Sequence, residues 1–104
     1  IAHRLAAGGP LLALLLDPAA EMALRDALSG EHAALDPESA TGLLGRIEAE
    51  LGAAPGTPVL LAAPDLRRPL RNLVAARFPR LPVVSYEELP PEQPVRPVGR
   101  IALA

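Results

Sequence analysis

The residues with the clearest chemical potential lie in one stretch, Pro64–Arg71, where Asp65 is followed by Arg67, Arg68 and Arg71. An apolar run precedes this stretch and a helix-like pattern follows it, and many phosphate sites combine a strand, a tight turn and a cationic helix start. The stretch matches neither G-x-x-x-x-G-K-[ST] nor G-x-G-x-x-G, so the specific phosphate loops are absent. The sequence therefore favours Asp65 as a helix cap and the arginines as a protein-contact surface, with an anion site as the alternative.

The other chemically capable residues do not combine into a catalytic or metal-binding set. His3 and His32 have no metal-like spacing to each other or to acidic residues. Asp17 and Asp36 each precede a proline at a predicted helix start, and helix capping accounts for both. No serine lies in a G-x-S-x-G context, and no nucleophile–base pair is evident. Because the chain also lacks Cys, we predict no catalytic residue, no metal site and no cofactor.

A second set of polar residues follows a short apolar run. It consists of Tyr86, Glu87 and Glu88, which place two acidic side chains beside an aromatic one. The first interpretation is a turn that ends a strand. The second is a protein contact, since Tyr is a common interface anchor. Arg67 and Arg71 are four residues apart and share one face of a predicted helix. These five residues are therefore our candidates for a protein interface.

The overall composition restricts the class of protein before any element is assigned. The 104 residues are the usual size of one domain, and 50% of them are hydrophobic, well above the range of disordered chains. The net charge is −2, every basic residue is Arg, and aromatic residues make up only 2% of the chain. An acidic balance without base-stacking side chains argues against a protein that binds nucleic acid.

Neither a signal peptide nor an apolar run long enough to span a membrane can be recognised in the sequence. Because the chain begins at Ile1 rather than Met, we expect it to be a fragment of a longer protein. The absence of a membrane span then applies to the fragment alone, and it does not prevent the parent from being membrane-bound.

Hydrophobic periodicity and helix-start residues predict strands and helices along the whole chain. Two helices that open at Asp17 and Asp36 follow the first apolar run, and a strand–helix–strand unit comes next, whose strands we expect to be parallel with a right-handed crossover. The expected fold class is α/β, a small single-domain mixed sheet of about four strands with about three helices, in the order β-α-α-β-α-β-β. The predicted elements are a strand at 11–16, helices at 18–28 and 37–51, a strand at 59–63, a helix within 66–78, a strand from 81 that leads into a turn or single helical turn by 89, and an edge strand at 98–104.

Pro69 does not fit this pattern. A proline in a helix interior removes a hydrogen bond and clashes with the preceding turn, whereas a proline in the first turn is tolerated. We therefore expect a looser turn after Asp65 and a regular helix that begins only near Pro69.

An ordered set of short motifs covers most of the chain. P-V-L-L is followed by D-L-R, then by F-P-x-L-P-V-x-S-Y-x-E-L, and finally by G-R-I. In this order, the motifs resemble the C-terminal part of the cytoplasmic region of type III secretion export-gate proteins, the FlhA/InvA-like export apparatus family. The resemblance runs from Leu14 to Leu103. The helix-start motif is matched by Asp65, Leu66 and Arg67, and the strand-end motif by Ser85, Tyr86, Glu88 and Leu89.

The resemblance implies a role that composition does not show. The parent would carry a multi-span region in the bacterial inner membrane, and this fragment would lie in the cytoplasm. Residues 1–10 would lead in from a preceding subdomain, and residues 11–104 would form the C-terminal α/β subdomain. The family implies a nonameric ring that receives and sorts export substrates and their chaperones, with no enzymatic activity in this region. The D-P-E-S and S-Y-E-E-L pieces lean toward a virulence injectisome rather than a flagellar system.

Two hypotheses follow from the sequence. One is a secretion-ring module that acts through protein contacts. The other is a small α/β ligand-binding or enzymatic domain that uses the Pro64–Arg71 turn as an anion site. Transmembrane segments upstream of Ile1 would favour the first, and a soluble catalytic domain there would favour the second.

Overall fold

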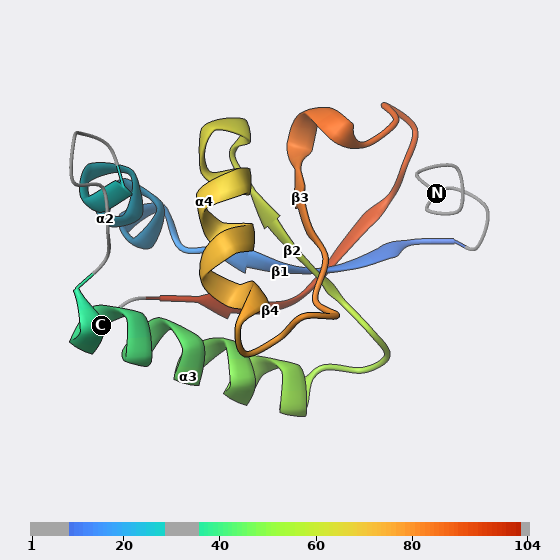
Figure 1. Ribbon diagram of the computed structural model, residues 1–104. Coiled ribbons are helices and arrows are strands. Elements are labelled where there is room, and N and C mark those ends of the chain that lie inside the picture. Colours follow the sequence, from blue (N-terminus) through green and yellow to red (C-terminus); the bar gives the residue numbers. More distant parts are fainter. Residues whose placement is uncertain (1–8, 29–35, 103–104) are drawn as a thin grey trace.

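The computed structural model describes residues 9–28 and 36–102 of the chain. Within these ranges, four strands form one sheet in the spatial order β3-β2-β1-β4, with three α-helices packed on it (Figure 1). The strands are β1 (Leu11–Leu16), β2 (Val59–Ala62), β3 (Val83–Ser85) and β4 (Val95–Ile101). The helices are α2 (Pro18–Leu28), α3 (Pro37–Ala53), α4 (Pro64–Ala75) and the short 3-10 helix η1 (Tyr86–Glu88).

The predicted α/β class is confirmed, including the parallel pairing of β2 with β3. The sheet is not mixed, however, because β1 pairs in parallel with both β2 and β4. The connection after β3 explains this difference, since it carries the chain from one edge of the sheet to the other and β4 enters in the direction of β1. β4 lies at an edge as predicted, but it begins at Val95 rather than Val98.

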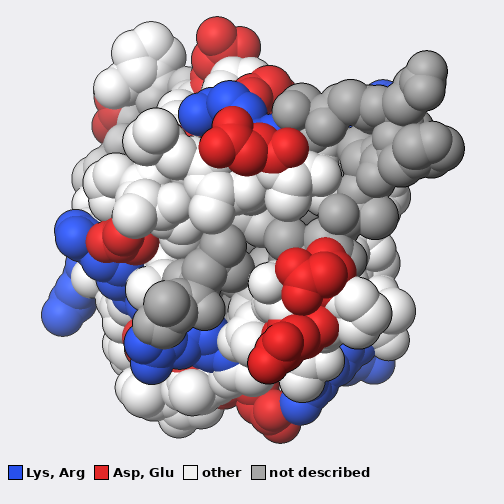
Figure 2. Space-filling model, turned by 90° about the vertical axis from the view of Figure 1, so that its left-hand side faces the viewer, with Lys and Arg blue, Asp and Glu red and all other residues white. Residues whose placement is uncertain are grey.

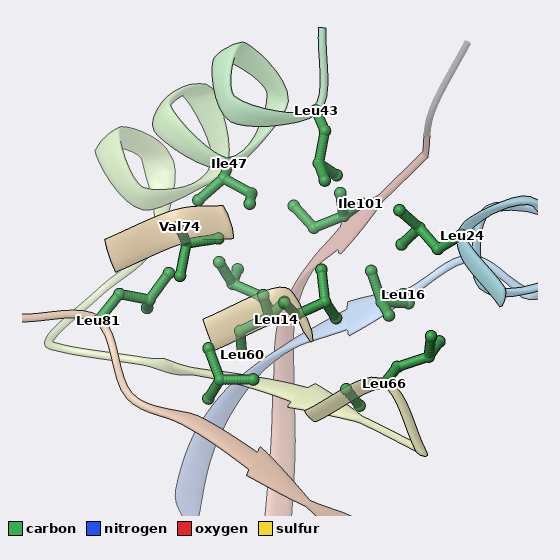
Figure 3. Close-up of a cluster of buried hydrophobic side chains, with 13 residues drawn as sticks. Leu14, Leu16, Leu24, Leu43, Ile47, Leu60, Leu66, Val74, Leu81 and Ile101 are labelled. Carbon is green, nitrogen blue, oxygen red and sulfur yellow. The ribbon is translucent and has the colours of Figure 1, made fainter. Parts of the chain in front are cut away.

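All three α-helices lie on one face of the sheet (Figure 1). Successive right-handed crossovers from β1 to β2 and from β2 to β3 place their connecting helices on the same side. Side chains alternate along each strand, so Leu14 and Leu16 of β1 and Leu60 of β2 point toward this helical layer. They meet the helix residues Ile47 and Val74 in a single cluster (Figure 3). Each fully buried leucine contributes about 1.5–3 kcal/mol from burial, so this cluster is the main source of stability.

A second, smaller cluster lies on the other face of the sheet. It contains the alternate residues of β1 and β2, among them Ala13, Val59 and Leu61, all of which are buried. Because β1 and β2 are buried on both faces, they read as continuous apolar runs in the sequence, which is usual for parallel sheets.

Gly99 allows β4 to approach α3 closely. A Cβ atom at this position would lie 2.8 Å from Cδ2 of Leu14 and would collide with a carboxylate oxygen of Glu50. Gly56 has a different role, because its φ of +63° lies in the left-handed region that glycine adopts without strain. It ends the turn that leads from α3 into β2.

The first two helix starts are those that the sequence predicts. The amide of Ala19 donates to Oδ2 of Asp17 at 3.2 Å, and the amide of Ser39 donates to Oδ2 of Asp36 at 3.1 Å. Hydrogen bonding from Ser39 also lowers the pKa of the Asp36 carboxyl. A proline follows each capping residue and fits the first helical position.

The start of α4 was predicted wrongly. The helix begins at Pro64, its N-cap is Ala63, and that residue forms no side-chain cap. Pro69 lies inside the helix instead of opening it. The fixed φ of Pro64 suits the first position. Burial of Leu66 and Leu70 on one face then keeps the segment helical, although Pro69 has no N–H to donate one turn back.

Candidate functional site

The carboxyl end of the sheet is the first place to look for a ligand, because open α/β sheets bind ligands outside the ends of their parallel strands. β2 runs there into α4 with Asp65 in its first turn, and β3 runs into η1. The helix that carries Asp65 and the 3-10 helix that carries Glu88 therefore both start at this end of the sheet. The partners of these two carboxylates decide what this end of the sheet can bind.

Asp65 forms a two-point ion pair with Arg25 of α2. Nε of Arg25 lies 2.6 Å from Oδ2 of Asp65, and Nη2 lies 3.0 Å from Oδ1. The hydrogen bond from Arg25 lowers the pKa of the Asp65 carboxyl, and the same bond raises the pKa of the guanidinium. The carboxylate therefore links α4 to α2 at the surface and does not cap its own helix, which corrects its predicted role as a helix cap.

Arg67 and Glu88, two of the predicted interface residues, contact each other. Nε of Arg67 lies 2.6 Å from Oε1 of Glu88, and that oxygen also accepts the amide of Ser85 at 2.7 Å. The bond from the Ser85 amide is the main cause that lowers the pKa of the Glu88 carboxyl, and Arg67 adds to it. The Arg67–Glu88 pair therefore connects α4 to η1, two elements that are distant in sequence.

The other three predicted interface residues are exposed. Nη1 of Arg71 donates to the carbonyl of Pro79 at 3.5 Å, the outer limit for a hydrogen bond. Tyr86 is 47% exposed, and burial of the rest of its side chain, with the nearby charge of Glu21, raises the pKa of its hydroxyl. Glu87 points outward beside it. All five residues remain interface predictions, although Arg67 and Glu88 also have a structural role.

Two hollows adjoin each other along the loop between α4 and β3. The larger has a volume of about 480 Å³ and the smaller about 320 Å³. They share residues 79–82, so we treat them as one groove and call it the β3 groove. Leu51 and Phe78 lie on its apolar side, and its other side is formed by Arg67, Arg71, Val83 and Val84.

Sequence reasoning missed Arg80, which is exposed and lines both hollows. Its position in the F-P-R-L-P segment was visible, and the amide of Leu81 donates to the carbonyl of Phe78 at 3.1 Å, a turn that leaves Arg80 exposed. What the sequence could not show is that Arg80 lies with Arg71, from a different element, along a common groove.

Charges elsewhere on the surface are interspersed. Figure 2 shows the side of the molecule that carries α2, where acidic and basic side chains alternate without a field of one sign. In the described ranges, no cluster of three or more His, Asp or Glu residues could hold a metal ion, and both histidines lie outside those ranges. No helix among the described residues has the length and apolar character to cross a membrane.

Comparison with known proteins gives consistent relatives. A family model described as the FHIPEP family matches residues 1–94. Protein hrpC2 of Xanthomonas euvesicatoria is 35% identical over 109 residues, and low calcium response locus protein D of Yersinia pestis is 32% identical over 111 residues. Both matches cover 99% of this chain but only 17% and 16% of the relatives, so the chain spans about a sixth of their length.

Solved structures share the fold. The Chlamydia pneumoniae CdsV protein superposes with a TM-score of 0.80 at 36% identity, over 96% of this chain and 31% of that one. CdsV in its complex with CdsO gives a TM-score of 0.78 at 36% identity, over 92% and 31% of the chains. The nonameric EscV cytosolic domain from the type III secretion system gives 0.71 at 24% identity, over 95% and 31%, and so shows the fold alone.

Proposed function

This chain belongs to the FHIPEP family, whose members here are type III secretion export apparatus proteins, and from that premise we propose that it is the C-terminal cytoplasmic subdomain of an inner-membrane export gate. The observation that carries the proposal is the match along almost the whole chain in both sequence and fold. Since the chain spans about a sixth of its curated relatives, the activity of the whole gate is part of the proposal.

The subdomain would act through protein contacts in a ring. The EscV cytosolic domain of the same fold is nonameric, and CdsV forms a complex with CdsO. We propose a nonameric ring of the parent, which receives and sorts export substrates with their chaperones. Within the chain, residues 1–10 would lead in from a preceding subdomain, and residues 11–104 would form the C-terminal subdomain.

A non-enzymatic role is supported by the carboxyl end of the sheet. Asp65 is held by Arg25, and Glu88 is held by Arg67 and the Ser85 amide, so both carboxylates have structural partners. The anion-site alternative at Pro64–Arg71 has less support for the same reason. A thermal-shift screen with phosphate, nucleotides and sugar phosphates tests it, and stabilisation that disappears in Arg67→Ala would favour it.

Assembly of the complete cytoplasmic region that contains this chain tests the ring. Light scattering should show a species of the mass of a nonamer at high concentration, and electron microscopy should show rings. Monomers that persist at high concentration, with no rings in the images, would contradict the proposal.

Export itself provides the second test. A parent gene that lacks residues 11–102 should lose secretion while its product still reaches the membrane. The matched control is Met22→Ala, because Met22 is 65% exposed and contributes little to the core. Normal secretion by the truncated parent would show that this subdomain is dispensable and would remove the proposed role.

A further inference from the structure

The edge of the sheet at β3 is available for another strand. β3 is the terminal strand in the order β3-β2-β1-β4, so within residues 9–28 and 36–102 it pairs on one side alone, with β2. The amide of Leu60 donates to the carbonyl of Pro82 at 2.9 Å, which places the polar groups of alternate β3 residues toward β2. The N–H and C=O of Val83 therefore face the open edge, where an added strand forms its hydrogen bonds.

The β3 groove, which extends from residues 56–58 before β2 to Val83 and Val84 of β3, has a single sign of charge. Among the described residues that line it, three are arginines and none is Asp or Glu. Arg67 is paired with Glu88, but Arg71 and Arg80 form no ion pair within the described part of the chain. This local excess of positive charge contrasts with the net charge of −2 of the whole chain. A ligand that complements it must be acidic.

The larger hollow adds a second requirement for the ligand. Its walls include Leu51, Phe78 and Leu81, and the lining residues with polar side chains are Thr57 and Arg80. Partly exposed apolar walls of this kind gain free energy when a large apolar side chain covers them. The partner must therefore present an apolar side chain beside its acidic residues.

We propose that the β3 groove binds an extended acidic segment of a partner protein, which adds as a strand to β3 and places an apolar side chain in the larger hollow. β3 has only three residues, so backbone pairing supplies few hydrogen bonds. Specificity then comes from the arginines and the hollow. The site is complete within one copy of this chain and does not depend on ring assembly.

The test uses the 104-residue chain and a synthetic probe, a capped peptide of alternating Glu and Val residues that ends in Phe. Isotope-labelled protein is titrated and followed by amide chemical shifts. Shifts should concentrate at residues 79–84, and the Kd should be at least ~10-fold lower than for a matched peptide with Lys in place of Glu, which equals about 1.4 kcal/mol. Equal affinity for the two peptides, or no binding, would overturn the proposal.

Charge-reversed variants locate the site. Arg71→Glu combined with Arg80→Glu should weaken binding at least ~10-fold, because two unpaired cations become anions. Arg96→Glu on β4 is the control, since Arg96 is exposed at the opposite edge of the sheet and should change affinity less than about twofold. Circular dichroism confirms that each variant is folded. An equal loss in both variants would place the peptide elsewhere.

Two further probes separate strand addition from other binding modes. A Glu/Val peptide that is N-methylated at alternate residues keeps its charge but cannot pair along one edge, so its affinity should fall. Inorganic phosphate should cause no comparable shifts at residues 79–84. If the methylated peptide binds equally well, strand addition is wrong, and if phosphate reproduces the shifts, the groove is a simple anion site.

Discussion

The carboxyl end of the sheet and the β3 groove use similar residues for different purposes. At the carboxyl end, Arg25 is bound to Asp65, and Arg67 is bound to Glu88. In the groove, Arg71 and Arg80 lack an acidic partner among the described residues. The first region is where α/β domains usually bind ligands, yet here its charges hold helices together. The second region is where cations remain available.

The difference shows that the role of an arginine depends on which residue it contacts, and that the residue type alone does not indicate that role. Arg67 and Arg71 are one helical turn apart and look equivalent in the sequence. Only Arg67 reaches Glu88, because η1 lies beside the first turn of α4. Function should therefore be sought at the groove and stability at the carboxyl end, and the predictions below test this division.

The largest effect is expected beneath the carboxyl end. Leu66 is 2% exposed, and Leu66→Ala should lower the free energy of unfolding by about 2–5 kcal/mol, because it removes buried contacts and leaves a cavity. Phe78 lines the groove and is only partly buried, so Phe78→Ala should cost less. Urea denaturation of both variants measures the comparison. A larger loss for Phe78→Ala would show that the groove is part of the core.

The next effect concerns the close contact of β4 with α3. Gly99→Ala should destabilise by about 1–3 kcal/mol, since its Cβ would force Leu14 and Glu50 to move. Gly45→Ala is the matched control in α3, where a Cβ meets nothing within 4 Å. It should raise stability by up to about 1 kcal/mol through helix propensity. Thermal unfolding of the two variants should give shifts of opposite sign, and a neutral Gly99→Ala would contradict the close packing.

The third prediction concerns how the stability contributed by the Glu88 contacts depends on pH. The folded pKa of Glu88 is lowered from its ordinary value of 4.5, so its interactions stabilise the fold above that value. This stability is lost as the pH falls through the lower folded pKa. Glu88→Gln should therefore lower stability at neutral pH and flatten its decline in acid. Glu87→Gln is the matched control, because it removes the same charge one residue away without touching the contacts of Glu88 with Arg67 and Ser85. Denaturation curves from neutral pH into the acidic range measure this, and identical profiles for both variants would contradict the pairing.

The smallest effect on stability is expected at the groove. Arg71→Ala and Arg80→Ala should each change the free energy of unfolding by less than about 0.5 kcal/mol, as is usual for exposed residues without strong partners. The same variants should weaken binding of the acidic probe. Unfolding and titration experiments on the same samples measure both. A large loss of stability would place these arginines with the structural charges of the carboxyl end.

Local chemistry determined much of the fold. The Asp-Pro pairs at positions 17 and 36 predicted two capped helix starts, because a carboxylate followed by proline suits the first turn in any tertiary context. The apolar runs at 11–16 and 59–63 predicted buried strands, and the ordered motifs indicated the family. These features depend on residues close together in sequence, so they could be read without the structure.

Tertiary structure decided what remained. Asp65 was predicted as a cap, but α4 begins at Pro64 with Ala63 as its N-cap, so the carboxylate lies within the first turn, where Arg25, 40 residues away, binds it. Pro69 stays inside α4 because the burial of Leu66 and Leu70 outweighs one missing hydrogen bond. The parallel direction of β4 and the meeting of Arg71 with Arg80 likewise depend on how the chain crosses the sheet. The sequence determined the elements and the family, and long-range packing decided which charges hold the fold and which remain free to bind.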